Sequence, residues 1–108
     1  TRRRTSMRPP EDLAAIIGGK RYSRKTATLL AGNDYWDGHN YERSGRNTFL
    51  YRTPRGAYFF AHLTQWIGEQ DSIEPCSIDE AISFFEDQYN QHRVSYDEAF
   101  PNIKIEDA

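Results

Sequence analysis

Residues 47–66 read Asn-Thr-Phe-Leu-Tyr-Arg-Thr-Pro-Arg-Gly-Ala-Tyr-Phe-Phe-Ala-His-Leu-Thr-Gln-Trp, and this stretch decides the fold. At its centre stands Thr53-Pro54-Arg55-Gly56, between two segments rich in aromatic residues. Proline suits the second position of a type I turn, and glycine can take the positive φ of a following bulge. The stretch predicts a β-hairpin with strands over 47–52 and 57–66. Whether the bulge forms, and hence the register, stays open.

The segments on either side of the hairpin extend this prediction. Residues 26–31, Thr-Ala-Thr-Leu-Leu-Ala, favour another strand because they are rich in β-forming residues. Glycine, asparagine and aspartate follow at 32–34 and at 37–40, as in turns. Residues 67–76 are mostly polar, which predicts a loop. We therefore expect an antiparallel β-meander of three to four strands.

A capping box predicts the C-terminal helix. In Ser77-Ile-Asp-Glu80 the serine can accept from the backbone N–H three residues on, and the glutamate can reach back. The helix should end near 87–89. A second box, Ser95-Tyr-Asp-Glu98, predicts a brief turn that Pro101 ends. The helix that begins at Ser77 carries one apolar face, which should pack on the hairpin. This face consists of Ile78, Ala81, Ile82 and Phe85.

The two ends of the chain differ in character. Residues 1–8 are rich in arginine and poor in apolar residues, so a flexible basic arm is expected. Pro9-Pro10-Glu11-Asp12 suits the first turn of a short helix through Ile17, which Gly18-Gly19 would end. The acidic residues 103–108 either fray or add an edge strand. The predicted fold class is α+β, with 9–108 as one domain in which the meander packs against the C-terminal helix.

The two halves of the chain carry opposite charge. Residues 1–55 hold 12 Lys and Arg against 5 Asp and Glu, whereas residues 56–108 hold 2 against 11. The formal net charge of −2 hides this asymmetry. Such a distribution indicates contact with nucleic acid or with another charged partner. Part of the charge can also be neutralised within the fold or between neighbouring chains.

The composition argues against a membrane or secreted protein. No apolar run approaches the roughly 18 residues of a membrane-spanning helix, so no membrane contact is expected. No apolar segment follows the N-terminal arginines, so a secretory signal is not expected either. The single cysteine, Cys76, favours a reducing, cytoplasmic location.

Catalytic and metal sites are not expected. The three histidines (39, 62 and 92) and Cys76 lack the spacing of metal ligands, so we expect neither a metal nor a cofactor. His62 lies on an aromatic strand and should be a packed or cross-strand residue. Cys76 precedes a predicted helix start, where the helix dipole would lower its pKa. No nucleophile signature accompanies it, so an enzyme that uses Cys76 or a histidine is the weakest alternative.

Acidic residues of the C-terminal half support the leading functional hypothesis, a non-enzymatic protein that binds another protein. An acidic surface can mimic a phosphate backbone and attract the basic channel of a nucleic-acid-handling complex. Acidic helix surfaces are also common simply because they are solvated. The candidate residues for this contact are Glu80, Glu86 and Asp87.

The alternative hypothesis is direct binding of DNA or RNA. Single-stranded nucleic-acid binders combine positive charge for phosphates with aromatic rings for bases. The same pattern fits an aromatic core with a solvated rim of arginines. The candidates are Arg2, Arg3, Arg4, Arg43, Arg46, Arg52, Arg55 and Tyr58.

Four stretches resemble a family of small uncharacterised bacterial proteins that are found on plasmids, phages and integrative elements. They are Lys20-Arg-Tyr-x-x-x-Thr-Ala-Thr-Leu29, Leu50-Tyr-Arg-Thr-Pro-Arg-Gly-Ala-Tyr-Phe59, Ser77-Ile-Asp-Glu-Ala81 and Ile105-Glu-Asp-Ala108. Ser23 replaces the aspartate that is usual in the first motif. The resemblance covers about 20–108 and implies a mobile-element accessory protein, such as an inhibitor of host defence of the anti-CRISPR kind.

Overall fold

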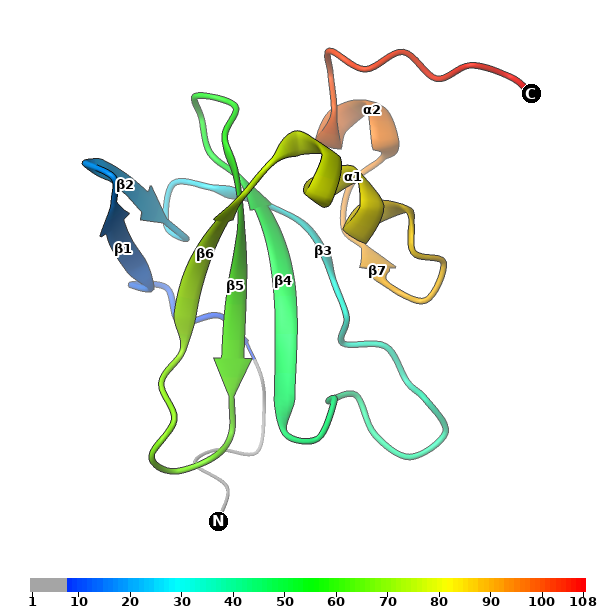
Figure 1. The fold of residues 1–108 in the computed structure, drawn as a ribbon. Helices are drawn as coiled ribbons and strands as arrows, with labels where there is room; N and C mark the ends of the chain where they lie inside the picture. Colours follow the sequence, from blue (N-terminus) through cyan, green and yellow to red (C-terminus); the bar gives the residue numbers. More distant parts are fainter. Residues whose placement is uncertain (1–7) are drawn as a thin grey trace.

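Two long antiparallel strands, β4 (Arg46–Arg52) and β5 (Tyr58–Thr64), form the centre of the fold (Figure 1). The structure is a computed structural model and describes residues 8–108. The predicted hairpin is confirmed, with small differences at the strand ends. Large apolar side chains lie opposite one another along it, as where Leu50 faces Phe60. Such cross-strand pairs stabilise a sheet.

The turn between β4 and β5 contains the bulge that the sequence left open. The Gly56 N–H donates to the Thr53 carbonyl at 2.9 Å, which closes a type I turn. Gly56 has a φ of 87°, and the Thr53 N–H donates to the Ala57 carbonyl at 2.8 Å. Glycine is favoured here because residues with a Cβ rarely adopt this conformation. The bulge sets the register in which Arg52 lies opposite Tyr58.

Three further strands complete a five-stranded antiparallel sheet. They are β3 (Thr28–Gly32), β6 (Ser72–Cys76) and β7 (Gln91–His92), and the order across the sheet is β6-β5-β4-β3-β7. The α+β class and the antiparallel meander are thus present, with more strands than expected. The loop predicted over 67–76 is wrong for 72–76. β6 is an edge strand that tolerates Pro75, and its few apolar residues give it a weak strand pattern.

The helix predicted through Ile17 is also wrong, because the segment is a β-hairpin. Strands β1 (Ala14–Ile17) and β2 (Lys20–Ser23) pair as a separate two-stranded sheet. Gly18 and Gly19 have φ values of 61° and 76°, as the central residues of a type I′ turn require. A four-residue apolar pattern fits a helix or a strand equally well, and the observed turn at the two glycines, with Ile17 opposite Lys20, shows that this one is a strand.

Two short helices cover one face of the five-stranded sheet. They are α1 (Ile78–Glu86) and α2 (Tyr96–Ala99), and each begins at its predicted capping box, which confirms both predictions. Ala81 and Phe85 are buried as expected, whereas Ile78 is 39 % exposed. α1 therefore packs on the sheet through only part of its predicted apolar face.

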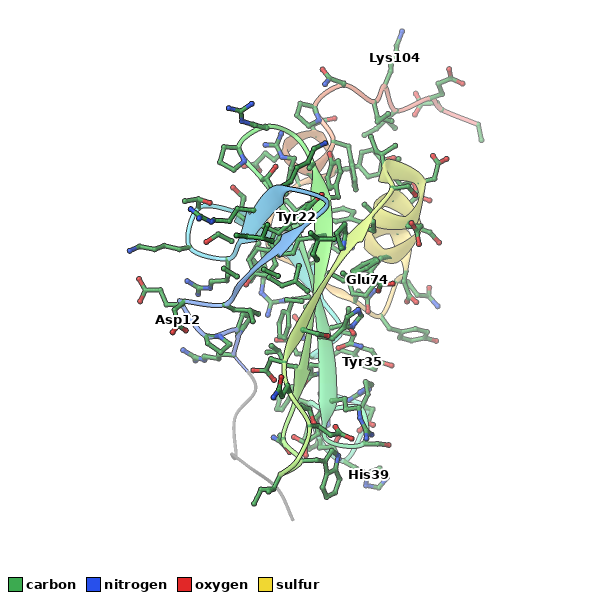
Figure 2. The ribbon with its side chains drawn as sticks, turned by 60° about the vertical axis from the view of Figure 1, so that its left-hand side comes forward. Asp12, Tyr22, Tyr35, His39, Glu74 and Lys104 are labelled. Carbon is green, nitrogen blue, oxygen red and sulfur yellow. The ribbon has the colours of Figure 1, made fainter. Side chains whose placement is uncertain are left out.

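The sheet is packed on both faces, which gives the molecule three layers. In Figure 2 the β1–β2 hairpin and α1 lie on opposite sides of the sheet. Successive residues of a strand point to opposite faces, so each strand contributes to both cores. The helix side buries Leu30, Leu50, Tyr58, Phe85 and Phe100. The hairpin side buries Phe49, Tyr51, Phe59, Leu63 and Ile73.

Polar groups hold the end of the sheet that lies opposite the β4–β5 turn. Asn47, Thr64 and Gln65 are buried there. The Gln65 N–H donates to the Gly45 carbonyl at 2.8 Å, and the Trp66 indole N–H donates to the Ser44 carbonyl at 2.8 Å. These bonds join the loops 33–45 and 65–71 into one unit. This unit positions two surface hollows that are described in later subsections. One lies on the helix side of the sheet, and the other lies on the hairpin side.

The C-terminal tail, residues 103–108, adds no strand to the sheet. The predicted flexible arm lies outside the described residues up to residue 7. Within 8–108, no helix has the length and apolar character that crossing a membrane requires.

Candidate functional site

The predicted basic surface is divided between the two ends of β4. Arg46 begins this strand and Arg43 precedes it, whereas Arg52 ends it and Arg55 lies in the following turn. Arg52 lies six positions along the strand from Arg46, a distance of about 20 Å. The described arginines therefore do not form one surface. The remaining members, Arg2, Arg3 and Arg4, lie outside the residues that the structure describes.

Tyr58 belongs to the core and not to a stacking surface. Its side chain is 7 % exposed, and its ring stacks on Phe100 with centroids 5.4 Å apart. Its hydroxyl donates to the Ala99 carbonyl at 2.8 Å. The prediction that Tyr58 stacks on a base is therefore wrong, because the register points the ring toward α2.

Arg43 and Arg46 are engaged within the protein. Arg43 donates to the Tyr35 and Asn40 carbonyls at 3.0 and 3.1 Å, and its guanidinium lies 4.1 Å from the Tyr35 ring centroid. Arg46 donates to the Glu69 carboxylate through Nε at 3.2 Å and through Nη2. The Arg46 guanidinium holds the pKa of Glu69 below its usual value. Both arginines thus stabilise the loop end of the sheet.

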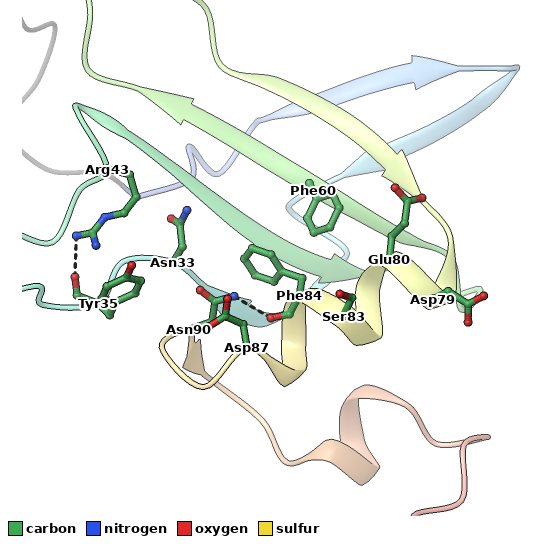
Figure 3. A pocket seen from close by; sticks show the side chains of 10 residues that line it. All are labelled: Asn33, Tyr35, Arg43, Phe60, Asp79, Glu80, Ser83, Phe84, Asp87 and Asn90. Carbon is green, nitrogen blue, oxygen red and sulfur yellow. Dashed lines mark hydrogen bonds between the residues drawn. The ribbon is translucent and has the colours of Figure 1, made fainter.

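A groove of about 700 Å³ lies on the helix face, between α1 and the loop after β3 (Figure 3). Phe60 and Phe84 form its floor, with ring centroids 5.2 Å apart. In Figure 3 the Phe60 ring lies between Arg43 at one end and Glu80 at the other. The α1 side carries Asp79, Glu80, Ser83 and Asp87, and the loop side carries Asn33, Tyr35 and Arg43.

The structure brings two of the three predicted acidic residues together. Glu80 and Asp87 are seven positions apart, so they lie on the same face of α1 and both line the groove. Glu86 lies elsewhere, because the Tyr96 hydroxyl of α2 donates to its carboxylate at 3.3 Å. Asp79 joins the groove, and the sequence reasoning did not single it out.

The groove carries an excess of negative charge. Asp79, Glu80 and Asp87 form no ion pair within residues 8–108. Hydrogen bonds from the Ser77 backbone and hydroxyl lower the pKa of Glu80, so this carboxylate is charged at neutral pH. Arg43 is the one cation among the lining residues, and the backbone carbonyls already described hold it.

A hydrogen-bonded chain crosses three strands on the same face of the sheet. His62 on β5 contacts Thr48 Oγ1 through Nδ1 at 3.0 Å and Glu74 Oε1 through Nε2 at 2.8 Å. In a neutral His62 the Thr48 hydroxyl donates to Nδ1, and the Nε2–H donates to Glu74. His62 is thus a cross-strand residue, as expected. Thr48 and Glu74 were not predicted, because their alignment depends on the register of three strands.

The pKa of Cys76 is shifted in the direction opposite to the predicted one. Burial raises its pKa to about 12, and the neighbouring carboxylates of Glu80 and Glu74 add to this effect. The expected lowering by the helix dipole is therefore wrong, because the half-buried thiol faces acidic neighbours. At neutral pH Cys76 is a protonated thiol, and the thiolate is the form that attacks electrophiles.

Neither a metal-ligand cluster among the described residues nor a known relative gives a further indication of the site. In the described part of the chain, no three histidine, cysteine, aspartate or glutamate side chains gather as metal ligands would. Comparisons with protein-family models, with curated proteins and with solved structures found no match.

Proposed function

We propose that this chain is a non-enzymatic binding protein that captures a basic segment of a protein partner in the groove beside α1. One observation supports this proposal above all. Three carboxylates without an ion pair among the described residues, Asp79, Glu80 and Asp87, line the groove together with the aromatic rings of Phe60 and Phe84.

Arginine and lysine side chains fit both features of the groove. A guanidinium can form paired hydrogen bonds with a carboxylate, and its flat face can stack on an aromatic ring. The aliphatic stem of either residue can cover apolar surface while the charged end reaches the carboxylate. An acidic ligand would instead meet like charge along the whole α1 side.

The class of partner follows from this chemistry. Proteins that handle nucleic acid have basic surfaces for phosphate, and an acidic row on a helix can occupy such a surface. The opposite charges would also accelerate association through electrostatic steering. We propose an inhibitor of a nucleic-acid-processing or host-defence complex, of the anti-CRISPR type, in agreement with the family resemblance.

Removal of two groove carboxylates tests the proposal. In Asp79→Asn/Asp87→Asn, residue 87 keeps an oxygen that can accept from the Tyr89 N–H, as Asp87 Oδ1 does at 3.0 Å. Glu80 stays unchanged because it belongs to the capping box of α1. The probe is a fluorescein-labelled octa-arginine peptide, measured by fluorescence anisotropy. We expect the affinity to fall about tenfold, since each exposed pair contributes up to about 1 kcal/mol.

The matched control is Asp97→Asn/Asp107→Asn, which changes the net charge equally away from the groove. We expect this variant to lose less than about twofold in affinity. An equal loss in both variants would mean that the peptide responds only to net charge, and the groove assignment would fail. Absence of peptide binding to the unmodified protein at low salt would also reject it.

Direct nucleic-acid binding through the hairpin and the arm is the second candidate function. One observation favours it, because Arg55 of the β4–β5 turn lies with Lys20 and Arg21 around a hollow beside Tyr22. This cluster contains one of the predicted arginines. An Arg21→Gln/Arg55→Gln variant that binds oligonucleotides as tightly as the unmodified protein would eliminate the cluster as their site.

A further inference from the structure

A second hollow, of about 650 Å³, lies on the hairpin side of the sheet at its loop end. It is far from the acidic side of α1, because Leu29 and Phe49 of the hairpin-side layer line it. Two aromatic residues of the loop after β3, Trp36 and Tyr41, also line it. The hollow contains three arginines, namely Arg8, Arg24 and Arg93.

Trp36 and Tyr41 form an exposed aromatic platform. Their side chains are 54 % and 58 % exposed, and their ring centroids are 5.1 Å apart with an angle of 51° between the planes. Burial normally stabilises rings of this size, so two adjacent exposed rings beside a hollow indicate a surface for binding. Neither ring is required to fill either core of the sheet.

The loop that carries this platform is held in place. Asp37 Oδ1 accepts from the His39 and Asn40 N–H groups at 2.9 and 3.0 Å, and these bonds lower the pKa of Asp37. Arg43 ties the loop further through its bonds to the Tyr35 and Asn40 carbonyls. A ligand therefore meets rings that are already arranged, which reduces the entropy lost on binding.

Two of the three arginines are available for an anion. Arg93 donates to Asp34 Oδ2 at 2.6 Å and is neutralised by it. Arg8 and Arg24 form no ion pair within the described part of the chain. Burial raises the pKa of the Tyr51 hydroxyl, and the nearby Arg24 and Arg93 guanidinium groups oppose this. Arg24 therefore lies near Arg93 and the Tyr51 hydroxyl, and it lines the hollow together with Arg8.

We propose that this hollow binds single-stranded nucleic acid, with bases stacked on the rings of Trp36 and Tyr41 and the adjoining phosphates at Arg8 and Arg24. Aromatic rings that accept a base beside cations that accept phosphate are the defining combination of such sites. Base stacking tolerates any sequence, so the site binds with little sequence preference. The site is separate from the acidic groove and from the cluster around Arg55.

Anisotropy of a fluorescein-labelled dT12 oligonucleotide at low salt tests the site. Trp36→Ala/Tyr41→Ala should weaken binding at least tenfold, because each stacked base contributes substantially to affinity. Arg24→Gln should weaken binding and reduce the slope of log affinity against log salt by about 0.7, as expected for one lost phosphate contact on a single strand. Thermal unfolding followed by circular dichroism checks that each variant is folded.

Matched variants separate this site from the other candidates. Tyr89→Ala removes a ring that is 63 % exposed outside the hollow, and Lys104→Gln removes a distant charge; both should bind dT12 within about twofold of the unmodified protein. Undetectable binding by the unmodified protein overturns the proposal. The proposal is also overturned if Arg21→Gln/Arg55→Gln loses affinity for dT12 and Trp36→Ala/Tyr41→Ala does not. Equally tight binding of free AMP would overturn the assignment to a strand in favour of a mononucleotide.

Discussion

The two faces of the central sheet are covered by different structures that carry opposite charge. On one face, α1 and α2 place Asp79, Glu80, Asp97 and Glu98 in their first turns, where carboxylates stabilise the helix dipole. On the other face, the β1–β2 hairpin exposes Lys20 and Arg21. Both faces nevertheless bury an aromatic core of similar character.

The two faces show where the opposite charges of the two halves of the sequence lie in the fold. The basic and acidic halves could have neutralised each other inside the fold. Within residues 8–108, two ion pairs between arginine and carboxylate join the halves, Arg46 with Glu69 and Arg93 with Asp34, and both lie at the loop end of the sheet. Three carboxylates at α1 line the groove on the helix side, and Arg8 and Arg24 line the hollow on the hairpin side, which is why we propose a basic ligand for one and a polyanion for the other.

The largest expected effect tests whether the two faces stabilise the fold equally. Phe59 on the hairpin side and Phe85 on the helix side are 0 % and 2 % exposed. Phe59→Ala and Phe85→Ala should each reduce the free energy of unfolding by about 3–5 kcal/mol, through lost burial and the cavity left behind. Urea denaturation measures the change.

The control for both substitutions is Ile16→Ala, because Ile16 is 66 % exposed. It should change the free energy of unfolding by less than about 0.5 kcal/mol. If Phe59→Ala has an effect as small as the control, the β1–β2 layer contributes little to the cooperative core, and the comparison between the faces breaks down.

A smaller effect is expected where α2 joins the sheet. Tyr58→Phe removes the donor to the Ala99 carbonyl and leaves that buried acceptor without this partner. The free energy of unfolding should fall by about 1–2 kcal/mol. Tyr89→Phe, at an exposed ring, is the control and should have almost no effect. Unchanged stability of Tyr58→Phe would show that the bond from the hydroxyl to the Ala99 carbonyl does not help to join α2 to the sheet.

The smallest effect concerns Cys76 on the helix side. Its pKa of about 12 predicts slow alkylation by iodoacetamide at pH 8, and faster alkylation of the urea-unfolded chain. Because the folded pKa lies above the ordinary 9.0, the stability linked to this thiol is complete below about pH 9 and is lost as pH rises toward 12.

Glu74→Gln sharpens this test, because it removes one of the carboxylates that raise the pKa of Cys76. The alkylation rate of the folded variant should rise slightly. Equal rates for the folded and unfolded forms of the unmodified protein would show that the thiol is neither protected nor shifted. That result would reopen the nucleophile hypothesis.

Local chemistry explains which elements could be predicted from the sequence. The turn at Gly56 and the capping boxes at Ser77 and Ser95 are short patterns whose hydrogen bonds lie within a few residues. β6 could not be predicted in this way, because it exists through pairing with β5. The β1–β2 hairpin was missed for another reason, since two glycines after an apolar run fit a helix end as well as a type I′ turn.

The candidate sites likewise contain residues that the sequence could predict and residues that depend on tertiary packing. Glu80 and Asp87 could be predicted because helical periodicity places them on one face. The floor of the groove needed Phe60 from β5, and the hollow on the other side needed Arg8, Arg24 and Arg93 from three separate segments. Trp36 and Tyr41 are close enough in sequence to be suspected, but their exposure depends on how the loop is folded.

The sequence by itself determined the central hairpin, the two helix starts and the opposite charges of the two halves, because these depend on neighbouring residues and on composition. Only the tertiary structure decided the faces on which those charges lie, the burial of Tyr58 and the separation of Arg46 from Arg52. The physical reason is that strand register and layer packing fix the direction of each side chain, and a shift of one residue reverses it.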